Sequence, residues 1–168
     1  MGGHSLDWFN ALPIDEVTAH LRVCNAADRF ASEIAARRPY ASKHELVETA
    51  EAVSLGLSWA EVSQVVGGHP RIGDRPKGES QEARSSRAEQ ASMASAEDDV
   101  RMALAEGNAR YEARFGHGYL IRAAGRTPRE ILAELQRRLG NDPTSERVEV
   151  TRQLAEITRL RVERLITP

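Results

Sequence analysis

The sequence has a single cysteine, Cys24, so it cannot contain an internal disulfide framework, and this fits a reducing compartment. We expect Cys24 to be buried and unreactive. Long apolar runs are also missing, because no stretch approaches the roughly 18 apolar residues of a membrane span. The first residues lack the basic segment and apolar core of a signal peptide. These absences predict a soluble, cytoplasmic protein without a membrane partner.

Aromatic residues are scarce, at 5% of the chain, and β-branched residues are only modestly represented. Both kinds of residue are enriched in strands, so their shortage argues against a sheet protein. Lysine is nearly absent, since only Lys43 and Lys77 stand among 23 basic residues and the others are arginines. The basic residues are scattered among 25 acidic ones, for a net charge of −2. Nucleic acid is therefore not an expected partner.

What is present is the pattern of a helical protein. Three Ser/Thr-x-x-Glu capping boxes, at Ser42, Ser58 and Thr127, mark the starts of helices. Between such marks the apolar residues recur at helical spacing. We predict helices over 5–12, 14–27, 29–37, 42–56, 58–66, 79–93, 95–114, 128–139 and 143–166. A chain of 168 residues fits one domain, so we expect an all-α fold in which residues 1–168 form a single compact domain of about eight or nine helices.

Two predicted loops, 67–78 and 115–125, interrupt the helices. In the second loop, the apolar stretch YLI is expected to be extended or to form a short helical turn.

The first loop, GGHPRIGDRPKG, places His69 among glycines and prolines. Pro70 restricts His69 to extended backbone geometry, and the flanking glycines allow the chain to turn sharply on either side. A histidine held in this way can be aimed, and with a pKa near ~6.5 it can exchange a proton at neutral pH. The alternative is a structural or simply exposed histidine.

A polar helix face follows the first loop. In the predicted helix 79–93, Ser86, Glu89 and Gln90 stand at i, i+3 and i+4 and share one face, which could grip a small polar molecule. The alternative is a solvated helix face. A Ser/His/Glu hydrolase built on Ser86, His69 and Glu89 is weakly supported, because the sequence has no G-x-S-x-G turn to expose the serine.

No metal site is expected from the sequence. The histidines and the one cysteine do not have the spacing of metal ligands, and HELVE at 44–48 lacks the second histidine of the H-E-x-x-H zinc motif.

Six fragments in order carry a resemblance that spans nearly the whole chain. They are HPRIGD, SRAEQ, NARYEARFG, YLIRAAGRTPREIL, RRLGNDP and EITRLRVERL. In this order and spacing the sequence resembles the 2-oxo-4-hydroxy-4-carboxy-5-ureidoimidazoline (OHCU) decarboxylases of urate degradation. The resemblance implies an all-helical, dimeric enzyme without metal or organic cofactor, which converts OHCU to (S)-allantoin and CO2. It also implies urate oxidase and hydroxyisourate hydrolase as pathway partners.

The resemblance assigns roles to residues that match the family's motifs. His69 matches the family's catalytic histidine, and Glu89 is expected to orient or tune it. The expected substrate-binding residues come from four places in the chain: Pro70, Ser86, Arg87, Ala88, Gln90, Tyr119, Leu120, Ile121, Arg122, Ala123 and Arg161. Backbone N–H groups of 119–123 are expected to complete the site.

The expected chemistry explains why no cofactor is needed. The ring of OHCU contains an imine bond that can accept the electron pair released when CO2 leaves, so the protein has to supply only placement, a proton relay and a selective grip. Loop 67–78 would aim His69 at the ring, and Leu120 and Ile121 would desolvate the departing carboxylate. The competing interpretation is a non-catalytic helical module that binds an anionic ureide or a partner helix.

Arg161 has two possible partners at this stage. It stands four residues after Ile157, at the edge of an apolar stripe, and a guanidinium placed there needs an anion. That anion is either the substrate or an acid such as Glu156 or Glu106 in a structural salt bridge.

Overall fold

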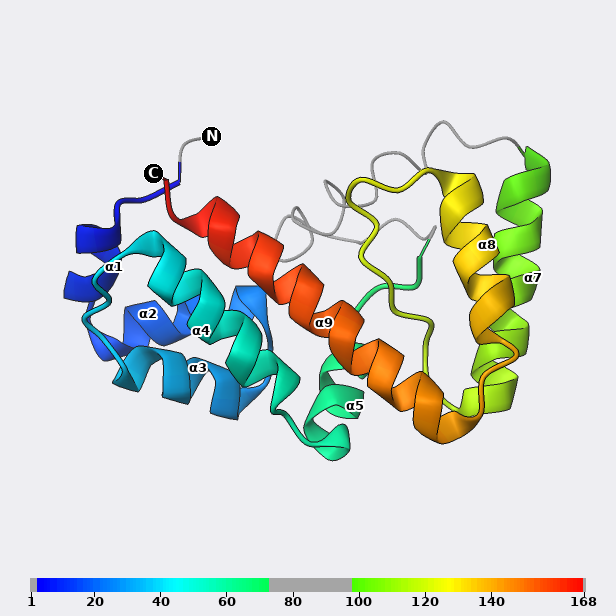
Figure 1. Cartoon of the computed structure of the whole chain (residues 1–168), viewed down its shortest axis with the longest axis horizontal. Helices are drawn as coiled ribbons and strands as arrows, with labels where there is room; N and C mark the ends of the chain where they lie inside the picture. Colours follow the sequence, from blue (N-terminus) through cyan, green and yellow to red (C-terminus); the bar gives the residue numbers. More distant parts are fainter. Residues whose placement is uncertain (1–2, 73–97, 168) are drawn as a thin grey trace. The chain divides into compact units, whose positions relative to one another are not determined.

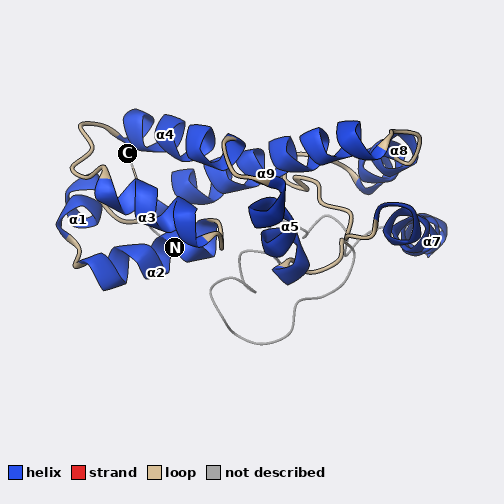
Figure 2. Cartoon of the chain, turned by 90° about the horizontal axis from the view of Figure 1, so that it is seen from below, coloured by secondary structure: helices blue, strands red, loops and turns tan. Residues whose placement is uncertain are grey.

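The computed structural model describes residues 3–72 and 98–167, and this part of the chain is helical, with connecting loops and no strand (Figures 1 and 2). The predicted all-α class is confirmed. The predicted helix 79–93 lies outside the described residues. Elsewhere the predicted bounds agree to within a few positions with those observed: α1 Leu6–Ala11, α2 Ile14–Cys24, α3 Asp28–Ala36, α4 Lys43–Leu55, α5 Trp59–Gly68, α7 Asp98–Phe115, α8 Pro128–Arg138 and α9 Pro143–Leu165.

The three predicted capping motifs stand at the starts of α4, α5 and α8, and those at Ser58 and Thr127 form complete capping boxes. In each, the hydroxyl oxygen accepts a hydrogen bond of 3.0 to 3.2 Å from the backbone N–H three residues further on. At Ser58 and Thr127 the glutamate completes the box by accepting from the N–H of the capping residue. At Ser42 the box is incomplete, because Glu45 accepts instead from the N–H of Ala41. These contacts satisfy N–H groups that the first turn leaves without a helical partner, which is why the sequence located these starts so well.

The chain forms two compact units. One comprises Met1–Val65 and Leu154–Pro168, and the other comprises Val66–Gln153. Helix α9 contributes its first half to the second unit and its second half to the first. The proposal that residues 1–168 act as one domain stays a prediction.

A buried polar network organises the first unit, in which α2 packs against α3 and α3 against α4. Asn25 donates from Nδ2 to Ser54 Oγ (3.2 Å) and Thr158 Oγ1 (3.1 Å), and its Oδ1 accepts from the N–H of Ala27 (3.0 Å). Asn25, Ser54 and Thr158 are all buried. Because each of these contacts has a defined geometry, the network fixes how the second half of α9 meets α2 and α4. Cys24 is buried nearby in sequence, as predicted.

The second unit has its own apolar core. Its members come from the chain after α5, from α7, from the segment before α8 and from α8: Ile72, Val100, Leu104, Tyr111, Tyr119, Ile121, Ala123, Ile131 and Leu135. α7 and α8 lie side by side (Figure 1). They approach closely at Gly107, where an added Cβ would lie 2.6 Å from Leu135 Cδ2. Glycine at this position therefore permits the observed packing of the two helices.

The two glycines before His69 do not form the sharp turn that the sequence predicted. Gly67 and Gly68 are the last two residues of α5, so the irregular segment begins at His69, and neither glycine has a positive φ. The predicted sharp turn at these glycines was wrong, because the helix continues through them. Positive φ values among the described residues occur instead at Gly116 (79°), just after α7, and at Gly125 (78°). The predicted irregular segment 115–125 is confirmed over 116–125, whereas Phe115 is the last residue of α7.

Candidate functional site

The predicted site residues fall into three groups. His69, Pro70 and the segment 119–123 belong to the second unit, Val66–Gln153, whereas Arg161 belongs to the first. Five predicted site residues lie outside the described part of the chain: Ser86, Arg87, Ala88, Glu89 and Gln90.

His69 stands immediately after the last residue of α5. Its backbone N–H donates to the carbonyl oxygen of Val66 at 3.1 Å, which closes the end of the helix. His69 and Pro70 are both partly exposed. The imidazole is therefore attached to a backbone that is fixed by a helix on one side and by a proline ring on the other. Such a backbone suits a side chain that acts as an acid or base, because it limits how far the imidazole can move.

The segment 119–123 is irregular and mostly buried, and hydrogen bonds attach it to α8 and α9. The Tyr119 hydroxyl donates to the carbonyl of Ile131 (3.0 Å), the Leu120 carbonyl accepts from Arg138 Nη1 (2.8 Å), and the Arg122 N–H donates to Gln153 Oε1 (2.8 Å). Tyr119, Leu120, Ile121 and Ala123 are buried, and Arg122 is half-buried. The Arg122 N–H, which was expected to face substrate, thus has a protein partner in this structure.

The two candidate segments share one core. Ile72, three residues after His69, packs in the same apolar cluster as Tyr119, Ile121 and Ala123. The segment that follows His69 and the segment 119–123, which are about fifty positions apart in the sequence, therefore pack in the same apolar core. The prediction that these segments act together has this structural support, and their contact with substrate stays a prediction.

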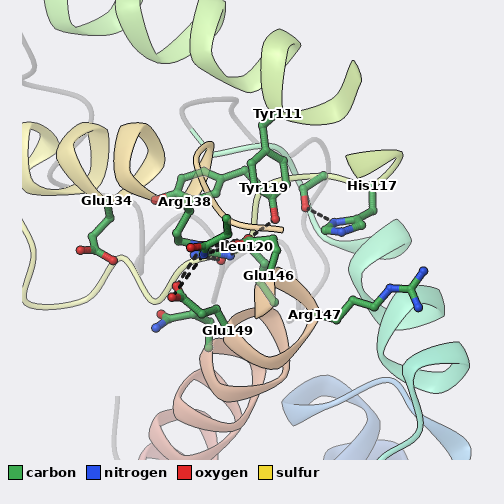
Figure 3. Close-up of polar contacts among 12 residues, drawn as sticks. Tyr111, His117, Tyr119, Leu120, Glu134, Arg138, Glu146, Arg147 and Glu149 are labelled. Atoms are coloured by element: carbon green, nitrogen blue, oxygen red, sulfur yellow. Dashed lines mark hydrogen bonds and ion pairs between the residues drawn. The ribbon is translucent and has the colours of Figure 1, made fainter. Parts of the chain in front are cut away.

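A buried ion pair that was not predicted contacts the segment 119–123 (Figure 3). Arg138, near the end of α8, donates from Nε (2.9 Å) and Nη2 (2.6 Å) to Glu146 Oε2, and both side chains are at most 1% exposed. Glu146 also accepts from the Tyr111 hydroxyl and from Asn141 Nδ2. The Arg138 guanidinium lies over the Tyr119 ring, 4.8 Å from its centroid. One guanidinium therefore contacts both the ring of Tyr119 and the backbone of Leu120.

The charges in this cluster are stabilised by one another. Burial lowers the pKa of Arg138, but the hydrogen bonds and charge of Glu146 more than offset this, so the net shift is upward. Burial raises the pKa of Tyr111 and of Tyr119 far above neutrality. Both hydroxyls therefore stay protonated and act as hydrogen-bond donors, as their contacts require.

The sequence contains a local signal for this pair. Arg138 continues the buried face of α8 that contains Ile131 and Leu135, at i, i+4 and i+7, and Glu146 lies one helical turn before buried Val150 on α9. A charged residue on an apolar stripe is rarely buried without a partner. Two such residues close in sequence could have suggested a buried pair.

Arg161 is buried in the first unit, at 5% exposure, and this agrees with its position beside the apolar stripe. Its Nη1 donates to the carbonyl oxygen of Val23 at 3.0 Å. Val23 is in the last turn of α2, where carbonyl groups lack helical partners and the helix dipole favours a cation. Arg161 therefore has a structural contact with a backbone carbonyl, which is neither of the two anionic partners expected from the sequence.

The described part of the chain offers neither a cluster of metal ligands nor a membrane-spanning helix. Residues 3–72 and 98–167 contain no group of three or more His, Cys, Asp or Glu side chains that could hold a metal ion. Within the same ranges, no helix is both long enough and apolar enough to cross a membrane.

Fold and site together define an all-helical protein that has a candidate acid–base histidine at a helix end and a second, buried candidate segment on the same core. The family model of OHCU decarboxylases matches residues 10–163. The chain therefore belongs to the OHCU decarboxylase family. This confirms the family that the sequence motifs indicated, and with it the prediction of a carboxy-lyase.

Individual relatives agree with this assignment. The chain is 32% identical over 133 residues to a 2-oxo-4-hydroxy-4-carboxy-5-ureidoimidazoline decarboxylase of Amia calva, covering 77% of this chain and 75% of that protein. It is 28% identical over 149 residues to the Arabidopsis thaliana uric acid degradation bifunctional protein TTL, covering 87% of this chain but only 46% of the plant protein.

Solved structures support the fold. The chain resembles an OHCU decarboxylase crystallised in the presence of (S)-allantoin, with a TM-score of 0.74 and 26% identity, over 88% of this chain and 96% of that one. It has the same fold as an (S)-allantoin synthase, with a TM-score of 0.74 and 15% identity, over 98% of this chain and 54% of that one.

Proposed function

We propose that this protein is a cofactor-independent decarboxylase that converts OHCU to (S)-allantoin and CO2, with His69 as general acid/base. The observation that carries the proposal is the family match over residues 10–163, which includes every predicted site residue. The Amia calva relative, named for this activity, adds support. The chain spans about half of the Arabidopsis protein, so only the matched part of that protein bears on the proposal.

The proposed reaction uses the substrate as its own electron sink. The bond between the ring carbon and the carboxylate breaks, its electron pair moves toward the ring imine, and CO2 leaves. The former imine nitrogen takes up a proton, and the enol that remains loses its hydroxyl proton to become a carbonyl while a proton is delivered to the neighbouring ring carbon that bears the ureido group. Delivery from one side gives one hand of allantoin. His69 supplies this proton relay, since imidazole gains and loses a proton near neutral pH.

The other proposed residues bind and orient the substrate. Glu89 orients or tunes His69, and Ser86 and Gln90 bind the polar edges of the ring and ureido group. Leu120 and Ile121 are buried apolar residues of the segment 119–123, a property that suits the exclusion of water from a departing carboxylate. A homodimer, a cytoplasmic location and the action of urate oxidase and hydroxyisourate hydrolase upstream stay predictions from the resemblance.

Circular dichroism during allantoin formation tests the function directly. OHCU made enzymatically is expected to give (S)-allantoin in the presence of the protein, because a chiral site protonates one face, whereas spontaneous decay gives a racemate. A rate no higher than spontaneous decay, or a racemic product, would refute the decarboxylase. Saturable binding of OHCU without turnover would instead favour the non-catalytic binding module.

Removal of metal should have no effect on this activity. We expect turnover to survive exhaustive EDTA treatment and dialysis, since decarboxylation into a ring imine needs no Lewis acid. Atomic absorption on the same samples serves as the control. A stoichiometric metal whose removal abolishes turnover would contradict this expectation.

Arg161→Lys separates substrate binding from a structural role. Lysine keeps the charge and one donor for the Val23 carbonyl but loses the planar fork that suits a carboxylate. If Arg161 binds substrate, kcat/KM should fall by roughly tenfold or more, with a shift in Tm of only a few degrees. A clearly lower Tm with normal kinetics would remove Arg161 from the site.

A further inference from the structure

We propose that Arg71 and Glu112 are positioning residues for His69: their ion pair ties the segment after the histidine to α7. The inference rests on the proposed function, because it assigns a role to residues that act through the proposed catalytic histidine. Neither residue is part of the predicted site.

The ion pair is bidentate. Arg71 Nε donates to Glu112 Oε1 at 2.9 Å, and Arg71 Nη2 donates to Glu112 Oε2 at 2.7 Å. Two parallel hydrogen bonds fix the direction of the guanidinium as well as its distance, which a single contact would not do. Arg71 is two residues after His69, and Glu112 is in the second half of α7, a helix of 18 residues. A short irregular segment is thus attached to a long, regular element.

A second contact attaches the same segment one turn earlier on α7. Asn108 stands four positions before Glu112, so both side chains lie on one face of the helix. Its Nδ2 donates to the carbonyl oxygen of Ile72 at 3.2 Å, and the residue is only 1% exposed. Among the described residues, its Oδ1 has no hydrogen-bond partner. Rotating the amide would place its oxygen against the Ile72 carbonyl and lose this bond. The orientation of the amide is therefore set by the bond that attaches the Ile72 backbone to α7.

His69 is consequently fixed from both sides within four residues. On the N-terminal side its own N–H bonds to the Val66 carbonyl, and on the C-terminal side Arg71 and Ile72 are bound to α7. Pro70 removes one backbone rotation between these anchors. Little freedom remains for the imidazole other than rotation about its own side-chain bonds. This accounts for how a histidine outside any helix can keep the position that proton transfer requires.

Physical chemistry separates a positioning role from a structural one. Arg71 is 48% exposed and Glu112 is 32% exposed, and exposed ion pairs contribute little to folding stability. By contrast, a displacement of about 1 Å in a reacting group can lower turnover by about 100-fold. Loss of the pair should therefore appear in kcat and hardly in Tm.

The test uses Arg71→Gln, Glu112→Gln and the double reversal Arg71→Glu with Glu112→Arg. Each single variant is expected to lower kcat for OHCU by about 10- to 100-fold. Tm should change by less than about 3 °C, and KM should stay within about threefold, since neither residue contacts substrate. The double reversal should recover at least tenfold of the loss. Arg29→Gln is the matched control: it removes the bidentate Arg29–Glu61 pair in the other unit and should leave kcat unchanged.

Each outcome is decisive. A wild-type protein without turnover would refute the proposed function itself. Given an active wild type, a kcat for Arg71→Gln within threefold of normal would overturn the positioning role. An equal loss in Arg29→Gln would overturn it as well, because the effect would then be unspecific. A single-variant loss that the double reversal does not recover would indicate direct contact of Arg71 with substrate and would also overturn it.

Discussion

His69→Asn is expected to lower kcat for OHCU by about 10²- to 10⁴-fold, the usual loss when a positioned acid or base is removed. Asparagine can form similar hydrogen bonds but cannot exchange a proton near neutral pH. The change should not unfold the protein, since the side chain is partly exposed and the backbone bond to Val66 remains. His69→Ala should give a loss of the same order. Stopped-flow circular dichroism would measure kcat, and thermal melting would measure the fold.

His44→Asn provides the matched control for this prediction. His44 is an exposed residue of α4 and has no proposed role, so its replacement should leave both kcat and Tm near the wild-type values. If His69→Asn keeps more than about a third of wild-type kcat, the general acid/base role of His69 is wrong. A low kcat accompanied by a large fall in Tm would point instead to loss of the fold.

Arg138→Gln is expected to destabilise the fold more than any of the other substitutions. Removing one member of a buried ion pair leaves the other charge buried without compensation, at a cost of about 3–5 kcal/mol. For a chain of this length that corresponds to a fall in Tm of about 6–20 °C. The Leu120 carbonyl and the Tyr119 ring also lose their contacts with the guanidinium. Calorimetry or denaturant titration would measure the loss.

The adjacent residue gives a matched control. Arg137 lies next to Arg138 on α8 and pairs with Glu134 and Glu149, but it is 51% exposed. Arg137→Gln should therefore cost no more than about 1 kcal/mol, the usual range of exposed pairs. Equal losses in the two variants would show that burial of the Arg138–Glu146 pair does not determine its contribution. Because Arg138 holds the segment 119–123, its replacement should also lower kcat/KM.

The sequence predicted the helices well because local chemistry determines where they start. Ser58 and Thr127 cap helices through contacts three residues away, which a sequence motif can describe. The end of α5 was harder, since Gly67 and Gly68 can adopt either helical or turn geometry. In the structure they remain helical, and the pair of glycines does not by itself distinguish the two geometries.

The candidate site was predictable only in part for a similar reason. His69 is conspicuous because of its neighbours in sequence, and the motif resemblance led to segment 119–123. The contacts that hold both, Arg71 with Glu112 and Arg138 with Leu120, join residues 41 and 18 positions apart. Such contacts depend on how helices meet in three dimensions. Only the charged residue on the apolar face of α8 offered a local hint.

The discontinuity of the first unit has a consequence for protein synthesis. Domains generally begin to fold as they leave the ribosome, N-terminal part first. Here α1 to α4 belong to a unit that also contains Leu154–Pro168, and Asn25 bonds to Thr158, 133 positions later. The ribosome must therefore translate all of residues 66–153 before the unit can close. During that interval Asn25 lacks the hydrogen-bond partner that Thr158 provides in the folded unit.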